Sequence, residues 1–329
     1  MDADWSARPR LDPRLAQRLI EKKAQLDRHR PLAPAVVQRL HDDLRVLLTY
    51  HSNAIEGNTL TLRETQLIIE HGLTVGGHPM REYLEATNHA EAFDHLATLA
   101  SGQAPITRDT ILTLHRLVMQ SNLEMAEQFR TIPVSIRGAR LTPPPARQVE
   151  GLIVEWIAWI DGVGKGYDPL LRAVIAHHGF LAVHPFVDGN GRTARLLLNL
   201  MLMCAQYPPA LLLRDWRIGY LQALATADTG VYTPLANLIG RAVEAGLDLY
   251  LDACAAVPEE EYLPLAELAE ITGYASTHLG WLIRQGRLAG VKRGGRWYGT
   301  LGAVERYRSD VEAGRFPAGR PRKRPNAED

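Results

Sequence analysis

One short stretch of the chain gathers side chains that can act on a phosphorylated substrate. It runs His-Pro-Phe-Val-Asp-Gly-Asn-Gly-Arg-Thr-Ala-Arg from His184 to Arg195. A histidine such as His184 can accept a proton near neutral pH. The carboxylate of Asp188 is a hard oxygen ligand, and Mg²⁺ typically binds one or two carboxylates together with substrate phosphates and waters. Together these side chains predict phosphoryl-type transfer to a deprotonated hydroxyl group.

The glycines and arginines of the same stretch predict where the phosphates bind. Gly189 and Gly191 allow close approach to the backbone, so the amide groups at the start of the next helix can point at an anion. Arg192 and Arg195 are three residues apart, so both planar, permanently charged groups can reach over the same helix end. Two arginines at this spacing suit a polyphosphate.

The elements around this stretch are predicted to be mostly helical. Residues 193–204 are apolar nearly all round, which is typical of a helix buried at the centre of a bundle. Such a helix would hold the preceding loop rigidly. Apolar residues recur at helical spacing in residues 11–28, 33–50, 61–71, 82–100, 107–120, 148–160, 169–182, 216–227 and 235–255. The predicted fold class is therefore mainly α.

One segment departs from the helical pattern. Residues 131–142 alternate apolar and polar side chains around Gly138 and end in Pro143-Pro144-Pro145, which predicts a short β-hairpin. The edge of such a hairpin, with Val134 and Ile136 on it, could accept another strand.

The motif His-Pro-Phe-x-Asp-Gly-Asn-Gly-Arg-x-x-Arg resembles, at every defining position, the signature loop of the Fic (Fic/Doc) family. The resemblance covers roughly residues 31–245. It implies a Fic helical bundle that transfers AMP from Mg-ATP to a Ser, Thr or Tyr hydroxyl of a protein, including this chain itself as a target. Because the loop grips phosphates and does not specify the base, other nucleotides or phosphocholine are alternative donors. A metal centre built from His177, His178 and His184 would leave the glycines and arginines unexplained.

The resemblance implies a role for each residue of the loop. His184 would activate the target hydroxyl, and Asp188 would hold Mg²⁺ between the α- and β-phosphates. The predicted hairpin of residues 131–142 matches the flap of the family in position, and this flap would hold the target segment by strand addition at Val134 and Ile136. The implied nucleotide-binding residues are Gly189, Asn190 and Gly191, which would form the anion hole, and Arg192 and Arg195, which would grip the phosphates.

A second match lies upstream, where Ser52-Asn53-Ala54-Ile55-Glu56-Gly57 resembles the inhibitory motif of the same family. By this resemblance Glu56 would pair with Arg195 and keep it from the γ-phosphate, while Ser52 would fix the inhibitory helix. A bidentate pair between arginine and carboxylate can compete with a phosphate when it is partly buried. An alternative role for Glu56 is to position a water molecule for the hydrolytic removal of AMP.

The C-terminal residues 257–312 are predicted to form a separate module. The pattern of residues 263–285 predicts a helix-turn-helix, with Gly273 in the turn and Gly286 after the second helix. Lys292-Arg-Gly-Gly-Arg-Trp-Tyr298 then predicts a basic hairpin tip, so the unit resembles a winged-helix or excisionase-like module. Such modules bind either DNA or proteins. A second alternative for the whole chain is therefore a DNA-binding regulator whose Fic core senses nucleotide.

Composition sets the remaining expectations. Lys plus Arg and Asp plus Glu are each 37, so net charge does not favour nucleic acid or an anionic membrane as a partner of the whole chain. Cys204 and Cys254 are far apart and do not have the spacing of metal ligands. The start of the chain is polar and has no apolar signal-peptide core, so we expect a cytoplasmic protein without a membrane anchor. Homodimerisation is an expectation from the family. The predicted domains are residues 1–103 with the inhibitory motif, residues 104–256 as the catalytic core, residues 257–312 as the winged-helix-like module and residues 313–329 as a disordered basic tail.

Overall fold

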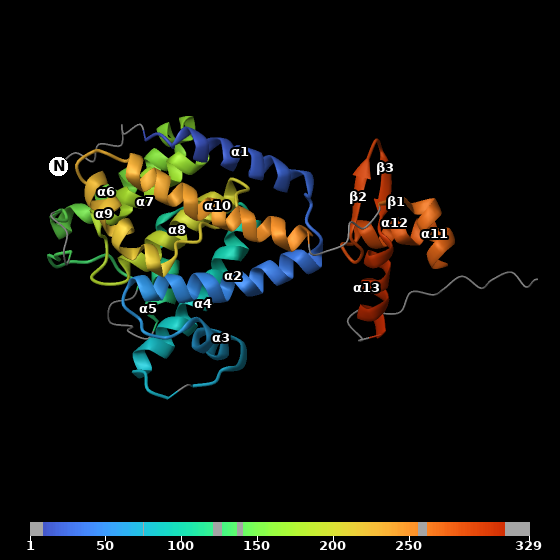
Figure 1. The fold of residues 1–329 in the computed structure, drawn as a ribbon, viewed down its shortest axis with the longest axis horizontal. Helices are drawn as coiled ribbons and strands as arrows, with labels where there is room; N and C mark the ends of the chain where they lie inside the picture. Colours follow the sequence, from blue (N-terminus) through green and yellow to red (C-terminus); the bar gives the residue numbers. More distant parts are fainter. Residues whose placement is uncertain (1–8, 75, 121–126, 137–140, 256–261, 313–329) are drawn as a thin grey trace, which may run out of the picture. The chain divides into compact units, whose positions relative to one another are not determined.

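The computed structural model describes residues 9–74, 76–120, 127–136, 141–255 and 262–312 (Figure 1). The chain divides into two compact units, one of residues 1–30 and 39–252 and the other of residues 31–38 and 253–329. The predicted boundary between residues 103 and 104 stays a prediction, and the predicted basic tail lies outside the described residues. Within the described residues, no helix is long and apolar enough to cross a membrane.

The first unit is built from helices that largely follow the predicted segments, although the start of one helix, residues 34–38, falls in the second unit. In chain order they are α1 (Pro13–Arg28), α2 (Pro34–Ile55), α3 (Leu62–His71), α4 (Met80–Ser101), α5 (Arg108–Met119), α6 (Val149–Asp161), α7 (Pro169–Val183), α8 (Asn190–Cys204), α9 (Arg217–Ala227) and α10 (Thr233–Ala255), with 3-10 turns η2 (Ala146–Gln148), η3 (Val163–Gly166) and η4 (Arg214–Trp216). Local chemistry sets several starts. Asp12 and Asp168 cap α1 and α7, where Pro13 and Pro169 occupy the first turn. Thr61 and Thr107 form capping boxes at α3 and α5.

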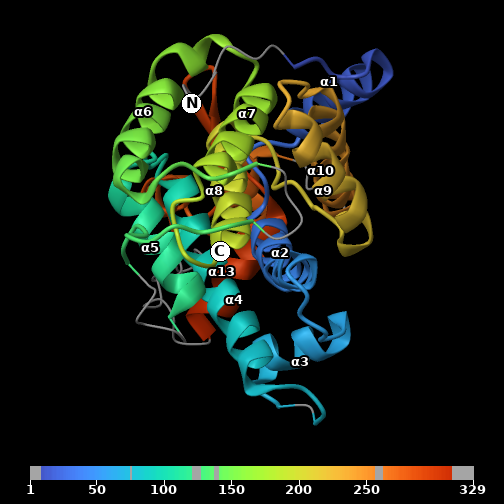
Figure 2. The same cartoon turned by 90° about the vertical axis from the view of Figure 1, so that its left-hand side faces the viewer.

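Helix α8 lies in the middle of the first unit, in contact with α4, α5 and α7 (Figure 2). All its residues from Arg192 to Leu202 are buried, which confirms the predicted central helix. It begins at Asn190, three residues before the predicted start, because Gly189 takes a left-handed conformation (φ 77°) that turns the chain into the helix. The loop before α8 is therefore joined directly to the most buried element of this unit.

Helix α1 packs closely on α10. A side chain at Gly240 would lie 3.0 Å from Leu15 and 3.1 Å from Leu11, so the glycine lets the two helices approach. At the edge of this contact Arg18 and Lys22 form ion pairs with Glu244 at 2.7 and 3.0 Å. These pairs lower the pKa of Glu244 to about 2, with the Arg18 hydrogen bond as the largest cause. Helix α1 is thus tied to the bundle by both packing and charge.

The predicted hairpin over residues 131–142 is not built from regular strands in its described parts. Residues 131–136 and 141–145 are bent or extended, and residues 137–140, with the predicted tip at Gly138, lie outside the described residues. Pro133 and Pro143 lack the N–H groups that a strand ladder needs. The guanidinium group of Arg130 joins the two flanks instead, by donating to the carbonyl groups of Ile132 and Pro144.

The second unit contains a small sheet and three further helices. Its elements are β1 (Leu263–Pro264), α11 (Leu265–Thr272), α12 (Ser276–Arg284), β2 (Gly290–Arg293), β3 (Arg296–Gly299) and α13 (Leu301–Glu312). The antiparallel sheet has the order β1-β3-β2, with Leu263 opposite Gly299 and Val291 opposite Tyr298. The first helix begins at Leu265 rather than Leu263, because Leu263 and Pro264 pair with β3. The predicted helix-turn-helix followed by a basic hairpin is otherwise as expected.

Candidate active site

His184 ends helix α7 in a left-handed conformation (φ 49°, ψ 61°). Its Nδ1 lies 3.3 Å from the carbonyl oxygen of Leu181. Because a carbonyl oxygen only accepts, this contact places the ring proton on Nδ1 and leaves the lone pair of the neutral ring on Nε2. Burial lowers the pKa of His184, as does the charge of Arg130, while the Leu181 contact, Glu56 and Asp188 act in the opposite direction. The ring is therefore predominantly neutral at pH 7 and can accept a proton.

The buried side chain of Arg130 supports His184 from behind. Its Nε donates to the carbonyl oxygen of His184 at 2.8 Å, and its backbone N–H donates to that of Pro185 at 2.9 Å. Sequence reasoning missed this residue because it lies far from the motif in the chain and matches no short pattern. The only available signal was an arginine placed just before the expected hairpin.

Asn190 locks the loop by using both ends of its side-chain amide. Its Oδ1 accepts from the N–H of Phe186 at 2.9 Å, and its Nδ2 donates to the carbonyl of the same residue at 2.8 Å. Asn190 was predicted as a nucleotide-binding residue. Its side chain is engaged within the protein, so any contact with an anion falls to its backbone N–H. The first N–H groups of α8, which have no partner inside a helix, provide such donors.

Helix α5 forms a platform under the loop. The ring of His115 stacks on Phe186 with a centroid distance of 3.5 Å and an interplanar angle of 5°. Its Nε2 donates to the carbonyl oxygen of Asp188 at 3.0 Å, and burial lowers its pKa to about 4. Met119 lies so close to Gly189 that a side-chain carbon at this glycine would be 2.9 Å from the Met119 sulfur. The platform therefore requires glycine at 189 for space as well as for its backbone angle.

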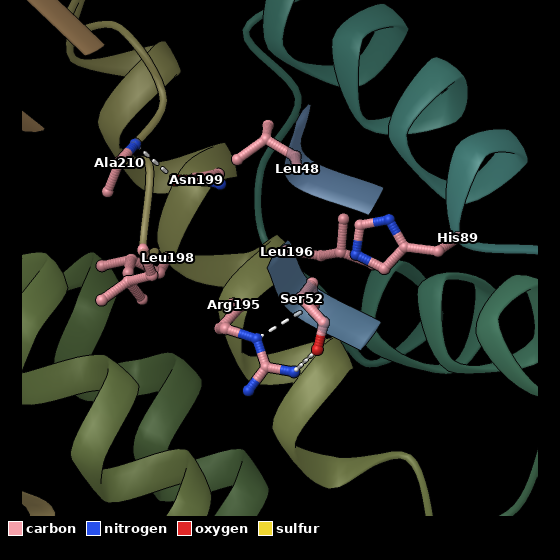
Figure 3. Close-up of a pocket in the computed structure, with 9 residues that line it drawn as sticks. Leu48, Ser52, His89, Arg195, Leu196, Leu198, Asn199 and Ala210 are labelled. Atoms are coloured by element: carbon pink, nitrogen blue, oxygen red, sulfur yellow. Dashed lines mark hydrogen bonds between the residues drawn. The ribbon is translucent and has the colours of Figure 1, made fainter. Parts of the chain in front are cut away.

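Arg195 is bound by the end of helix α2. Its Nη2 lies 2.8 Å from Oε1 of Glu56 and also donates to the carbonyl oxygen of Ser52 at 2.9 Å. Its Nε donates to the hydroxyl oxygen of Ser52 at 2.9 Å, as drawn in Figure 3. The guanidinium is almost fully buried, while 41% of the Glu56 side chain is exposed. Arg195, Ser52 and His89 also line a cavity of about 20 Å³, which is large enough for a water molecule.

Gly191 makes the approach of Glu56 possible. A side-chain carbon at residue 191 would overlap Oε1 of Glu56 and would lie 3.1 Å from its carboxyl carbon. The Glu56 carboxylate therefore rests directly against the backbone at the start of α8, over the predicted anion hole. The predicted pairing partners, Glu56, Ser52 and Arg195, are brought together by the fold.

The end of α2 is itself held firmly. Asn53 donates to the carbonyl oxygen of Glu85, and Asn58 donates to the carbonyl oxygen of Glu82. Arg217 donates to the carbonyl oxygen of Ile55 at 2.6 Å. These bonds fix the turn that follows Glu56, so its carboxylate is presented by a well-supported helix end.

Arg192 lies on the other side of the helix start and has looser surroundings. Its guanidinium is 3.6 Å from Oε1 of Glu85 and 3.8 Å from Oδ2 of Asp188. Nη2 also contacts the sulfur of Met119 at 3.6 Å, and the buried Nε has no hydrogen-bond partner among the described residues. A buried arginine with such weak contacts is suited to receive an anionic ligand.

Asp188 has the character of a ligand for a hard cation. Its Oδ1 accepts from the N–H of Gly189 at 2.6 Å, while its side chain is 64% exposed. Among the described residues, no group of three or more His, Cys, Asp or Glu side chains could hold a metal ion by itself. A single accessible carboxylate beside a phosphate site fits Mg²⁺, which binds through few protein ligands together with phosphates and waters.

The other predicted residues have separate positions. Val134 and Ile136 are half-buried in the extended flank that starts at Arg130. His177 lies between the carbonyl oxygen of Ala194 and the hydroxyl of Tyr220, and burial lowers its pKa to about 3. His178 lies between Tyr232 and Asp228, both at 2.9 Å. These two histidines are structural members of the core.

Comparisons with known proteins agree with this geometry. The sequence model of the Fic/DOC family matches residues 105–202. The chain is 35% identical over 220 residues to "Protein adenylyltransferase fic-1" of Caenorhabditis elegans, covering 66% of this chain and 43% of that protein. It is 32% identical over 253 residues to "Protein adenylyltransferase Fic" of Drosophila grimshawi, covering 76% of this chain and 52% of that protein. The chain thus spans about half the length of these curated relatives.

Solved structures give the same result. The structure of Fic-1 (residues 134–508) from C. elegans is similar with a TM-score of 0.66 and 32% sequence identity, over 74% of this chain and 73% of that one. A Fic domain-containing signaling protein from Bacteroides thetaiotaomicron is similar with a TM-score of 0.67 and 25% identity, over 75% of this chain and 100% of that one.

Proposed function

Because the chain belongs to the Fic/DOC family, we propose that it is a nucleotidyltransferase that moves AMP from Mg-ATP to a hydroxyl group of a protein. The observation that carries this proposal is the arrangement at the start of α8. A half-buried, neutral histidine and an accessible carboxylate meet the N-terminus of α8, which carries two arginines. The names of the curated relatives, which are protein adenylyltransferases, support the same reaction.

In the proposed reaction, Nε2 of His184 takes the proton from the target hydroxyl. The hydroxyl oxygen then forms a bond to the α-phosphorus of ATP, and the bond from that phosphorus to the bridging oxygen breaks, so that pyrophosphate leaves. The backbone N–H groups of Asn190 and Gly191 would stabilise the charge on the phosphate oxygens. Arg192 would bind the phosphates directly, and Asn190 keeps the loop in shape through Phe186.

Asp188 would hold the Mg²⁺ that accompanies ATP. When bound, the ion neutralises phosphate charge and favours the departure of pyrophosphate. The bond from the N–H of Gly189 to Oδ1 orients the carboxylate, and the exposed side chain leaves it accessible to the cation.

Glu56 is proposed to restrain this activity. Two observations support this role. The 2.8 Å pair with Glu56 neutralises the charge of Arg195, which the γ-phosphate of ATP would need, and the carboxylate against Gly191 fills the space that this phosphate would take. The pair is more than a surface contact, since the arginine is buried and Ser52 orients it. ATP would then bind with its phosphates out of line for attack.

The proposal is tested by incubating the full chain with Mg²⁺ and α-labelled ATP, alone and with a cell lysate. We expect little label on protein with the wild type, strong label with Glu56→Gly, and none when Glu56→Gly is combined with His184→Ala. Asp43→Gly, at an exposed acid on helix α2, the helix that precedes Glu56, is the matched control and should behave like the wild type. Absence of label with Glu56→Gly, although the protein binds ATP, would contradict AMP transfer. Release of AMP from pre-labelled protein that requires Glu56 would instead identify AMP removal as the activity.

We further propose that the second unit binds duplex DNA. Residues 271–304 contain no Asp or Glu and carry five cations, on α12, on the β2–β3 hairpin and on the turn between them: Arg284, Arg287, Lys292, Arg293 and Arg296. Within residues 262–312 the acids lie on α11 and α13. The hairpin tip is exposed, with Gly294 and Gly295 at positive φ. A basic hairpin beside the second helix of a helix-turn-helix is suited to contact phosphates.

This proposal is tested by fluorescence anisotropy of a labelled duplex with the full chain over a salt series. The double variant Lys292→Glu, Arg293→Glu should weaken binding at least about tenfold and flatten the salt dependence. The control, Arg14→Glu with Arg28→Glu on α1, should not. Equal binding by both variants would count against a DNA surface and favour a protein partner for this unit.

Three further expectations are part of the proposal. The target includes the chain itself, the protein acts in the cytoplasm, and it forms a homodimer. Self-labelling in the assay above and the molar mass from light scattering test the first and the third.

A further inference from the structure

The guanidinium group of Arg130 lies among backbone carbonyl groups. Only 4% of the residue is exposed, and among the described residues its side chain donates hydrogen bonds to carbonyl oxygens alone. Nε donates to His184 at 2.8 Å, and Nη1 donates to Ile132 at 3.2 Å. Nη2 donates to Pro144 at 2.6 Å and more weakly to Val183 at 3.4 Å. Burial without a carboxylate partner lowers the pKa of this arginine, although it stays charged at neutral pH.

These carbonyl groups come from two different parts of the active site. Val183 and His184 form the end of α7, where the last carbonyls lack partners inside the helix. Ile132 and Pro144 belong to the two flanks of the flap, which form no strand ladder in their described parts. One planar group with donors in fixed directions therefore satisfies both sets at once.

The backbone of His184 needs such support. A left-handed conformation at a residue other than glycine persists only when the surrounding structure determines it. Arg130 binds the carbonyl of His184 through its side chain and that of Pro185 through its backbone, so it fixes the two peptide groups that follow His184.

We infer that Arg130 is a positioning residue that fixes the base of the flap and the backbone of His184 to one rigid group. This inference rests on the proposed function, in which the flap holds the target segment and His184 deprotonates its hydroxyl. The distance between hydroxyl and base is then set by a single side chain. Displacements of about 1 Å in such a geometry can reduce a rate about 100-fold.

Arg130 also acts on the charge of the catalytic ring. The groups that bias the pKa of His184 are Arg130, which lowers it, and Glu56 and Asp188, which raise it, in addition to burial and the Leu181 carbonyl. Removal of the Arg130 charge should therefore raise the pKa of His184. Lysine at this position would keep the charge but would lose the fork that reaches both flanks.

The experiment compares Arg130→Met and Arg130→Lys in the Glu56→Gly background, with Arg14→Met on the exposed side of α1 as the control. Five properties are measured: the rate of self-labelling from α-labelled ATP, the affinity for Mg-ATP by calorimetry, the titration of the His184 ring by NMR, the melting temperature, and the hydrogen exchange of residues 131–136. We expect the rate to fall about 100-fold in Arg130→Met and about tenfold in Arg130→Lys. The affinity for Mg-ATP should change less than about twofold, because the hydrogen-bond partners of the Arg130 side chain include none of the residues that are expected to bind the nucleotide. The pKa of His184 should rise in Arg130→Met and stay closer to the parent value in Arg130→Lys.

A different pattern would overturn the inference. If rate, ATP affinity and melting temperature fell in parallel in both variants, Arg130 would be a general scaffold residue. Unchanged rates would exclude positioning altogether. If the Glu56→Gly parent did not transfer AMP, the proposed function would fail. The His184 titration and the hydrogen exchange of residues 131–136, which should become faster in Arg130→Met, would still decide the role of Arg130.

Discussion

The two arginines of the motif lie one turn apart on α8 but have very different surroundings. Arg195 makes three bonds of 2.8 to 2.9 Å to Glu56 and Ser52. Arg192 is buried to a similar degree, yet its ion pairs are 3.6 and 3.8 Å long and its Nε has no partner among the described residues. One arginine is thus occupied by the chain, and the other is available for a ligand. The difference indicates that restraint acts on one half of the phosphate site only.

The largest expected effect comes from acid, which disturbs the surroundings of both arginines. Burial lowers the pKa of His89 and His177, near Arg195, to about 3 and that of His115, near Arg192, to about 4. The unfolded chain binds these protons near pH 6.5 and the folded chain does not, so stability is present above pH 6.5 and is lost as pH falls toward 3 to 4. Each histidine contributes up to about 1.4 kcal/mol per pH unit in that window. Melting temperatures from pH 7.5 to 4.5 should fall steadily.

A matched pair of variants tests the origin of this loss. His177→Gln should make the fall in melting temperature with pH shallower, whereas His71→Gln, at an exposed position on α3, should leave it unchanged. A flat profile in the wild type would show that the buried histidines are not the cause.

The next effect concerns the available arginine. In the Glu56→Gly background, Arg192→Ala should reduce the rate of AMP transfer by about 10²–10³, as expected for a lost donor to transition-state charge. Arg14→Ala is the control, and labelling from α-labelled ATP is the measurement. A reduction of less than threefold would mean that the loose contacts of Arg192 do not mark a phosphate ligand.

A smaller effect on stability separates the two arginines directly. Arg195→Ala removes three short bonds and leaves Glu56 unpaired, whereas Arg192→Ala removes only long contacts. We expect Arg195→Ala to lower the free energy of unfolding by about 2 kcal/mol more than Arg192→Ala, a value kept modest because Glu56 is partly exposed. Denaturant unfolding measures the difference, and equal losses would remove the contrast between the two sites.

The smallest effect belongs to Ser52. Ser52→Ala removes the hydroxyl that accepts from Nε of Arg195 while the backbone carbonyl of residue 52 remains. Loss of one such bond is worth about 1 kcal/mol, so self-labelling of the otherwise wild-type chain should rise about fivefold. Ser101→Ala, on the exposed end of α4, is the control. A decrease in labelling would show that Ser52 supports catalysis rather than restraint.

The residues whose chemistry is carried by a short motif could be found in the sequence. His184, Asp188 and the two arginines belong to one stretch, whose residue types and spacing predict phosphate chemistry. Ser52 and Glu56 belong to another stretch and were expected from its resemblance to the inhibitory motif of the family. The helices were predicted for the same reason, since periodicity and caps such as Thr107 and Asp168 are local signals.

Residues that act across long distances in the chain could not be found in this way. Arg130 binds carbonyl groups, which every residue has, so no partner side chain marks its role. His115 lies on α5 and reaches the loop residue Asp188 from 73 positions earlier in the chain. Asn190 was expected at the anion hole, but nothing in the sequence indicated that its side chain closes the loop on Phe186, because that contact depends on the loop geometry. The flap was expected as paired strands. In its described parts the prolines prevent a regular strand ladder, and Arg130 joins the two flanks by binding their carbonyl groups.

The left-handed backbone of His184 affects the choice of an inactive variant. Glycine and asparagine adopt φ near 49° readily, whereas alanine is strained there. His184→Ala therefore removes the base and also favours a shift of the loop, which could weaken nucleotide binding for reasons unrelated to proton transfer. His184→Asn removes the base and tolerates the same backbone angle, so it is the better substitute for trapping a target protein on the enzyme while ATP is bound.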